Sequence, residues 1–243
     1  MEISRHKLDI ILKNICFLDS GGGGETYYDP KINKVIKIFH YYNEPFLYEP
    51  YTKEKVMKFN GIVTKTFIFP NDVILVDGIV VGYICDYVKG KTLQKINLLS
   101  LNLLEFSNRV KECLPDISIV SDNNIALYDL LYNIMYGKDG LFIIDTDDYI
   151  ISHKDNLYKS NISIFNDSIK NFLVDNYFDE FVNANNLLKE MYYDKDCNIS
   201  YFLDAFYKSL SESIGNEIKV LNEAFPVINK KIYEPNFIRR RNR

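Results

Sequence analysis

The first half of the chain has the pattern of β-strands: apolar residues either alternate with polar ones or form short runs. Residues 34–39 (KVIKIF) place apolar side chains around two lysines, and residues 63–69, 73–76 and 79–87 are rich in β-branched and aromatic side chains. Asp77-Gly78 separates the last two segments and is a strong hairpin signal. The pattern predicts a small sheet in this part of the chain.

A helix is expected between the first of these strands and the others. Residues 45–59 (PFLYEPYTKEKVMKF) scatter apolar positions among charges, and Pro50 followed by Thr52 suggests where the helix begins. Thr52 is the expected N-cap, because its hydroxyl can accept a hydrogen bond from a free backbone N–H.

The second half of the chain has the spacing of helices. Residues 92–113, 167–188 and 199–225 are amphipathic at a helical period, and Pro115 is expected to close the first of them. A β-rich hairpin at residues 134–149 interrupts these helices and ends in a group of acidic residues.

This order of elements predicts an α+β fold with two lobes in a single domain. The small β-rich lobe covers about residues 1–88 and the mainly helical lobe about residues 91–243, with the junction near Val88-Lys89-Gly90. No internal repeat or linker-like stretch separates the lobes, so we expect them to act as one unit.

Composition supports a folded chain with a packed core. The 243 residues are 47% hydrophobic and 26% charged, which excludes wholesale disorder and collagen-like repeats. The formal net charge of −4 argues against a protein that coats nucleic acid. The C-terminal segment 239–243 (RRRNR) is strongly basic. It is either a solvated tail or a segment that contacts nucleic acid or an acidic partner.

The cysteines and the apolar runs exclude further classes. Cys16, Cys85, Cys113 and Cys197 lie far apart with no CxxC pair, so they predict buried thiols rather than a zinc site or a disulfide framework. No apolar run is long enough to span a bilayer, and the first residues lack the pattern of a signal peptide. We expect a cytoplasmic protein.

The clearest chemical signal is a run of glycines followed by a lysine. Gly21, Gly22, Gly23 and Gly24 can bring backbone N–H groups close to phosphate oxygens, although a flexible hairpin is the alternative. Lys37 lies in an otherwise apolar strand, where a charge needs a partner unless it reaches solvent from an edge strand.

The order of these motifs and of those that follow resembles the protein kinase superfamily. Gly21 and Gly24 match the second and third glycines of its phosphate-binding loop, and Asp19 stands in place of the first. Val35-Ile36-Lys37 is similar to the strand whose lysine contacts the α and β phosphates of ATP. The resemblance therefore implies that the four glycines and Lys37 bind the nucleotide.

The resemblance also assigns a carboxylate and a hinge to the first lobe. Glu54, with Glu49 as the competing candidate, resembles the helix residue that pairs with the lysine, unless it is a solvated surface residue. The segment that contains Asp86 and Val88 resembles the hinge between the lobes, which would contact the adenine edge mainly through backbone groups.

In the second lobe, NIALYDLLYNIM resembles the catalytic loop of the family. With one residue lost from the loop, Asp129 is the base that accepts the substrate hydroxyl proton and Asn133 is a magnesium ligand. With no residue lost, Tyr128 stands at the base position, and a tyrosine cannot act as that base at neutral pH. The second alternative would make the protein a pseudokinase.

IDTDD at residues 144–148 resembles the strand end that carries the metal-binding aspartate of the family. The resemblance implies that Asp145 ligates Mg²⁺, with Mn²⁺ as a substitute, and oxygen ligands suit such cations. Asp147 and Asp148 are either part of this group or solvated turn residues. Asp167 resembles the aspartate at the start of the central helix, which braces the catalytic loop.

The sequence therefore predicts an ATP-dependent phosphotransferase with a kinase-like fold, in which Lys37, Asp129 and Asp145 carry the catalysis and a protein Ser/Thr hydroxyl is the acceptor. Two alternatives stay open: a small-molecule kinase of the choline or aminoglycoside type, and an inactive pseudokinase that serves as an interaction module. No membrane partner is expected.

Overall fold

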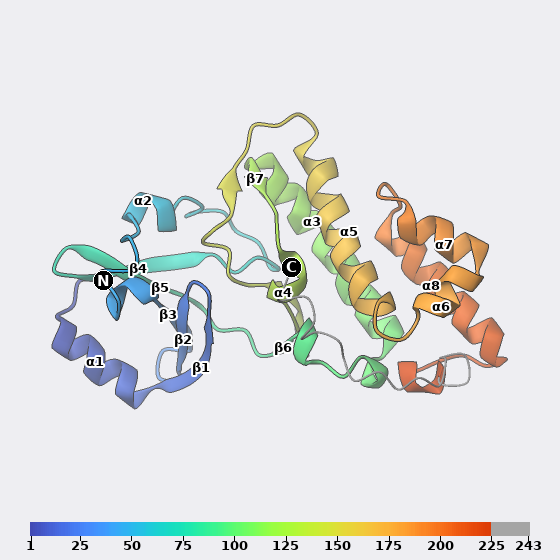
Figure 1. Ribbon diagram of the computed structural model, residues 1–243, viewed down its shortest axis with the longest axis horizontal. Helices are drawn as coiled ribbons and strands as arrows, with labels where there is room; N and C mark the ends of the chain where they lie inside the picture. The colour runs from blue at the N-terminus through green and yellow to red at the C-terminus, as the bar shows by residue number, and fades with distance from the viewer. Residues whose placement is uncertain (225–243) are drawn as a thin grey trace. The chain divides into compact units, whose positions relative to one another are not determined.

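The computed structural model describes residues 1–224, and the chain has an α+β fold (Figure 1). Contacts divide it into two compact units. The first unit consists of Met1–Lys89 together with Phe142–Asp148. The second consists of Gly90–Leu141 and the chain from Tyr149 onward. The sequence pattern does not predict that residues 142–148 return to the first unit.

The first unit is built on a five-stranded antiparallel sheet with the order β1-β2-β3-β5-β4. Three pairs of neighbours are consecutive in the chain, and the neighbours β3 and β5 are brought together by a longer connection. The strands are β1 (Cys16–Gly21), β2 (Gly24–Asp29), β3 (Lys34–Phe39), β4 (Pro70–Val76) and β5 (Ile79–Asp86).

Local sequence explains the best-defined parts of this sheet. The strand predicted at residues 34–39 is β3, with the same bounds. The predicted hairpin joins β4 to β5, where Val76 pairs with Ile79 across the two-residue turn. Asp77 and Gly78 have φ angles of 52° and 77°, the left-handed conformation that such turns require.

The two faces of the sheet have separate apolar cores. On one face, helix α1 (Arg5–Asn14) packs through Leu8 against the β3 residues Ile36 and Ile38. On the other face, Phe39 of β3 packs with Val56 of the short helix α2 (Lys53–Val56). Because side chains alternate along a strand, Lys37 lies on the same face as Phe39.

Helix α2 begins where the sequence predicts but is shorter than expected. Thr52 is its N-cap, and its hydroxyl accepts a hydrogen bond from the Lys55 N–H at 3.2 Å. A 3-10 helix, η1 (His40–Tyr42), follows β3 directly. The residues between η1 and α2 do not join the predicted helix.

The strand predicted at residues 63–69 is wrong. Thr64 closes a local turn there, because its hydroxyl donates to the Phe67 carbonyl at 3.0 Å and accepts from the Phe67 N–H at 3.1 Å. Such side-chain hydrogen bonds compete with strand pairing. Phe67 instead makes an isolated parallel bridge with Ile143, which attaches the returning segment Phe142–Asp148 to the first unit.

The second unit is mainly helical, and its longest helices are α3, α5 and α8. The predicted hairpin at residues 134–149 forms β8 and β9, and β8 also pairs with β6. The residues from Gly140 to Leu141 in β9 belong to this unit, whereas the end of that strand belongs to the first. The elements are β6 (Lys91–Thr92), η2 (Leu93–Lys95), η3 (Leu98–Ser100), α3 (Leu103–Asp122), β7 (Ile125–Ala126), α4 (Leu130–Asn133), β8 (Ile134–Gly137), β9 (Gly140–Ile143), β10 (Ile150–Ile151), α5 (Leu157–Val174), α6 (Asp179–Ala184), α7 (Asn186–Tyr193), α8 (Ile199–Ile214) and η4 (Leu221–Ala224).

Pro115 does not close the first long helix as predicted. Helix α3 starts later, after the N-cap Asn102, and runs through Pro115 to Asp122. Val110, Ile117 and Val120 are fully buried on both sides of the proline. Burial of this apolar face offsets the cost of about 3 kcal/mol for a proline inside a helix.

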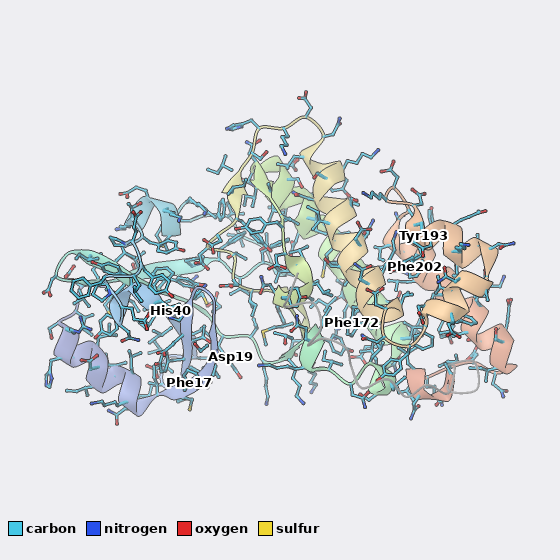
Figure 2. All side chains as sticks on the ribbon, viewed as in Figure 1. Phe17, Asp19, His40, Phe172, Tyr193 and Phe202 are labelled. Atoms are coloured by element: carbon cyan, nitrogen blue, oxygen red, sulfur yellow. The ribbon has the colours of Figure 1, made fainter. Side chains whose placement is uncertain are left out.

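The later helices are divided differently from the prediction. The segment predicted as one helix at residues 167–188 is spread over α5, α6 and α7, and α5 begins before it, at Leu157. The helix predicted at residues 199–225 ends at Ile214, because Gly215 takes a left-handed C-cap conformation with φ 79°. Phe202 of α8 and Phe172 of α5 are buried among these helices (Figure 2).

Within residues 1–224, no helix is both long and apolar enough to cross a membrane. The cysteine prediction is correct for Cys85, Cys113 and Cys197, which are free and buried, and wrong for Cys16, which is exposed on the edge strand β1. The basic segment 239–243 lies outside the described residues.

Candidate functional site

A buried lysine lies at the centre of the candidate site in the first unit. Lys37 of β3 is only 4% exposed. Its ammonium forms ion pairs with the carboxylates of Asp145 and Asp147, and the distance from Nζ to Asp147 Oδ1 is 3.0 Å. The glycine-lysine motif and the acidic motif, which are far apart in the sequence, therefore meet in one unit.

Asp147 is the most enclosed carboxylate of this group. It is 2% exposed, and its carboxylate also accepts a hydrogen bond from the Tyr83 hydroxyl at 2.9 Å. Lys58, just after α2, donates to the Asp147 backbone carbonyl at 2.6 Å. The interpretation of Asp147 as a solvated turn residue is wrong, because β5 and the turn after α2 enclose it. Asp148 is exposed.

Charge and burial act in opposite directions on Lys37. Burial alone would lower the pKa of the Lys37 ammonium, but attraction to Asp147 and Asp145, with a hydrogen bond to each, raises it above its ordinary value. Burial raises the pKa of the Tyr83 hydroxyl well above 10.0, and the charge of Asp147 adds to this effect. Lys37 is therefore charged, and Tyr83 is a hydrogen-bond donor, at neutral pH.

Asp145 differs from Asp147 in exposure and in backbone conformation. Its side chain is 45% exposed, and its φ angle of 60° lies in the left-handed region. Partial burial raises the pKa of the Asp145 carboxyl, Lys37 lowers it, and the balance is a raised pKa. Non-glycine residues held in this backbone region are enriched at functional sites. Asp129, the other expected catalytic carboxylate, also has a positive φ angle, 49°.

The donor set around Asp145 suits a metal held together with phosphate. No cluster of three or more His, Cys, Asp or Glu side chains that could hold a metal ion occurs among residues 1–224. A closed cage is not needed for Mg²⁺, which commonly uses one or two carboxylates, water and substrate phosphates. The exposed carboxylate of Asp145 fits that requirement.

The glycine run forms the turn between β1 and β2. Gly21 pairs with Gly24, so Gly22 and Gly23 are the turn residues. A Cβ atom at Gly23 would lie 3.1 Å from Lys37 Nζ, which shows how closely the turn approaches the lysine. His40 of η1 is labelled in Figure 2. Its Nε2 atom lies 2.8 Å from the Gly21 carbonyl oxygen and links η1 to the turn.

An open pocket of about 260 Å³ lies beside this turn. Tyr51, one of its lining residues, stacks on Phe39 with ring centroids 4.3 Å apart, and Lys55 lies over the other ring surface at 4.0 Å. The pocket is lined by Gly22, Gly23, Phe39, His40, Tyr41, Tyr48, Glu49, Pro50, Tyr51 and Lys55.

The prediction that Glu54 pairs with Lys37 is wrong. Glu54 lies in the first turn of α2 and is exposed. Glu49, the competing candidate, is also exposed and lines the pocket described above. The carboxylates that contact Lys37 come instead from Asp145 and Asp147, in the segment that returns to the first unit.

The expected hinge residues lie at the end of the sheet. Asp86 is the last residue of β5, is exposed, and forms an ion pair with Lys34 of β3. Val88 follows in irregular backbone and is partly buried. Tyr87 between them stacks on Tyr28 with ring centroids 4.0 Å apart.

The expected catalytic loop lies in the second unit. Asp129 and Asn133 stand at the two ends of the single-turn helix α4, and the Asn133 side-chain amide donates to the Asp129 carbonyl at 3.2 Å. The Asp129 carboxylate is exposed and does not cap the helix. Tyr128, the alternative base, packs its ring on Tyr149, with centroids 5.4 Å apart.

The loop is braced by a different residue from the one expected. Asn161 of α5 is fully buried and accepts from the Leu127 N–H at 2.9 Å, while its amide donates to the Ile125 carbonyl at 2.8 Å. Asp167 lies in the middle of α5, not at its start, and the side-chain hydrogen bonds to the loop backbone at Ile125 and Leu127 come from Asn161 instead. The prediction for Asp167 is wrong.

Sequence reasoning missed Tyr83, Lys58 and His40 as parts of the site, and it left Asp147 open between a member of the acidic group and a solvated turn residue. One sequence signal could have indicated Tyr83: like Lys37, it carries a polar group within an otherwise apolar strand, residues 79–85 (IVVGYIC). A comparison with protein-family models and with curated proteins finds no match to the chain.

Proposed function

We propose that the chain is an ATP-dependent phosphotransferase of the protein-kinase-like superfamily, which transfers the γ-phosphate to a Ser/Thr hydroxyl of a protein. In this proposal the α+β architecture is a kinase-like fold, and the first unit carries the nucleotide-binding groups. The hinge segment with Asp86 and Val88 contacts the adenine edge.

One observation supports the proposal most strongly. The turn formed by Gly22 and Gly23 lies against the ammonium of Lys37, and the same ammonium is paired with Asp145. A glycine turn, a buried cation and a partly exposed carboxylate are the groups that phosphoryl transfer needs, because its catalysis is mostly positioning and charge neutralisation.

Each group has a defined task on the phosphates. The backbone N–H groups of the glycine turn and the ammonium of Lys37 bind and orient phosphate oxygens. Asp145 would hold Mg²⁺ or Mn²⁺, which neutralises developing negative charge on those oxygens when it is bound. The ion pairs with Asp145 and Asp147 keep the Lys37 ammonium charged and hold its orientation before a nucleotide binds.

The second unit supplies the remaining groups of the proposal. Asp129 is the base that orients the acceptor hydroxyl and takes its proton, and Asn133 is a further metal ligand. The exposed carboxylate of Asp129 can be reached by an acceptor. Tyr128 is a poorer candidate for the base, because its ring packs on Tyr149.

A small-molecule acceptor is the second candidate, and one observation favours it. Helix α5 already begins at Leu157, so only residues 146–156 connect Asp145 to it. They contain the two-residue strand β10 and no helix. Protein kinases dock their peptide substrates on a longer segment at this place, so a short connection suits a smaller acceptor.

The test is ADP release by the full chain with ATP and Mg²⁺ or Mn²⁺, followed by mass analysis for phosphate on the protein. Turnover that both Asp145→Asn and Asp129→Asn abolish supports the phosphotransferase, and phosphate on Ser or Thr favours a protein acceptor. Turnover that survives both substitutions rejects the site. No ATP binding and no turnover by the wild type would favour a pseudokinase.

A further inference from the structure

We propose that Asp147 is the carboxylate that positions Lys37 for the nucleotide, and that Tyr83 and Lys58 hold Asp147 in place. Asp145 is thereby left to face the metal. The role of Lys37 toward a nucleotide rests on the proposed function, whereas the pairing of Lys37 with Asp147 can be tested without it.

Asp147 is fixed from three directions. Its carboxylate accepts from Lys37 Nζ at 3.0 Å and from the Tyr83 hydroxyl at 2.9 Å, and its backbone carbonyl accepts from Lys58 Nζ at 2.6 Å. At 2% exposure it has no access to solvent. The side chains of Lys37 and Tyr83 both donate to Oδ1 of this buried carboxylate, so loss of either donor removes a hydrogen bond that the desolvated charge cannot regain from water.

The register of the sheet provides this arrangement. Lys37 of β3 and Tyr83 of β5 are directly paired across the strands, so their side chains leave the same face of the sheet. The Lys37 ammonium lies 5.5 Å from the centre of the Tyr83 ring. Tyr83 therefore presents its hydroxyl to the same carboxylate that the neighbouring lysine contacts.

Asp145 is suited to a different task. Its side chain is 45% exposed, so a hydrated cation can reach it. A cation cannot reach Asp147 without opening the core of the unit. Of the two acids that pair with Lys37, Asp147 is thus the positioning residue and Asp145 the metal-facing residue. Glu54 of helix α2 does not position Lys37, because it is exposed.

The first experiment measures ATP affinity of the full chain by calorimetry, once with Mg²⁺ and once with EDTA. Asp147→Asn is expected to weaken both affinities by about tenfold, the loss of one charge-assisted hydrogen bond, and to leave their ratio unchanged. Asp145→Asn is expected to abolish the difference between the two conditions. Tyr83→Phe is expected to act like Asp147→Asn but less strongly, and Asp77→Asn, a change in an exposed acid of the turn between β4 and β5, is the matched control.

The assignment is overturned if Asp147→Asn leaves the affinity for metal-free ATP unchanged, or if it removes the effect of Mg²⁺. Tyr83→Phe keeps the test valid should Asp147→Asn fail to fold. A wild type that binds ATP under neither condition rejects the proposed function, and the pairing is then decided by unfolding.

The second experiment is a double-mutant cycle in urea unfolding, which needs no nucleotide. Asp147→Asn is expected to lower the unfolding midpoint of the wild type more than that of Lys37→Met. The same cycle with Asp145→Asn is expected to show a smaller interaction, because that carboxylate is partly solvated. An interaction with Asp145 as large as that with Asp147, or none with Asp147, contradicts the proposal.

Discussion

Gly23 and Lys37 lie in such close contact that any side chain at Gly23 would meet the ammonium: a Cβ atom there would stand 3.1 Å from Nζ. The Lys37 side chain cannot easily move away, because its ammonium is paired with the carboxylates of Asp145 and Asp147. We expect Gly23→Ala to weaken ATP binding about tenfold by displacing the lysine or lifting the turn. Gly22→Ala is the control, since a Cβ there meets nothing within 4 Å. Equal ATP affinity of the two variants would contradict the expected role of the turn.

A glycine is needed at position 24 for the packing of the sheet and not for contact with ATP. Its φ angle is 148°, and a Cβ atom would lie 2.1 Å from the Ile38 carbonyl oxygen. We expect Gly24→Ala to lower the free energy of unfolding by about 3 kcal/mol. Gly78→Ala, at a positive φ angle with open space around it, should cost about 1 kcal/mol. Urea unfolding of both variants checks the difference, and equal losses would show that crowding at Gly24 is relieved.

Lys37 and Lys34 belong to the same strand but have different surroundings. Lys37→Met leaves the enclosed carboxylate of Asp147 without its cation, so we expect a loss of about 3 kcal/mol in unfolding free energy and a loss of ATP affinity greater than about tenfold. Lys34→Met removes an ion pair with Asp86, which is 58% exposed, and should cost less than about 1 kcal/mol. Similar losses in the two variants would argue against the buried pair.

Tyr83 gives a prediction about alkaline pH. Its pKa in the folded protein lies well above 10.0, the ordinary value that it regains on unfolding. The folded protein therefore binds the proton more tightly, so the stability that Tyr83 contributes is fully present below about pH 10 and is lost as the pH rises further. We expect Tyr83→Phe to flatten the fall in unfolding free energy above about pH 10.

Unfolding in urea at several pH values measures this effect. Tyr201→Phe is the matched control, because Tyr201 is 66% exposed and should leave the alkaline limb as steep as in the wild type. If Tyr83→Phe and Tyr201→Phe show the same fall in unfolding free energy above about pH 10, deprotonation of the Tyr83 hydroxyl is not coupled to unfolding.

Lys170 stabilises the second unit through its charge. It is 1% exposed, and its ammonium donates to the backbone carbonyls of Met191, Tyr192 and Asp194 at 3.0, 3.2 and 2.7 Å. These carbonyls lie at the end of α7, where a helix lacks partners and favours a cation. We expect Lys170→Met to cost about 3 kcal/mol, measured by thermal unfolding. Lys189→Met, an exposed change in α7, should cost less than about 0.5 kcal/mol.

The sequence predicted those elements that depend on neighbouring residues. The alternation in β3, the Asp77-Gly78 turn and the Thr52 cap are decided within a few residues, and all three are confirmed. The α+β class follows from the same local patterns. The errors at Thr64 and Pro115 have a different origin: a side-chain hydrogen bond to Phe67 in one case, and burial of both halves of α3 in the other.

The candidate site could be predicted only in part, because its carboxylates are distant in sequence. Lys37 and Asp145 stood out as a charge in an apolar strand and an acid after one. Asp147 has the sequence context of a solvated turn, and only its pairing with Lys37 and Tyr83 shows that it is buried. Glu54 has the expected position in a helix, yet α2 ends after one turn and leaves it exposed.

The first unit is discontinuous, and this affects the order in which it can fold during translation. Its five strands emerge from the ribosome before residues 142–148 exist, so Lys37 then has no counter-charge. An ammonium cannot be buried alone at acceptable cost, so this face of the nascent sheet stays open until much of the second unit has been synthesised. A gene fragment that stops at Lys89 would encode all five strands but neither acid, and its product would expose that face to aggregation.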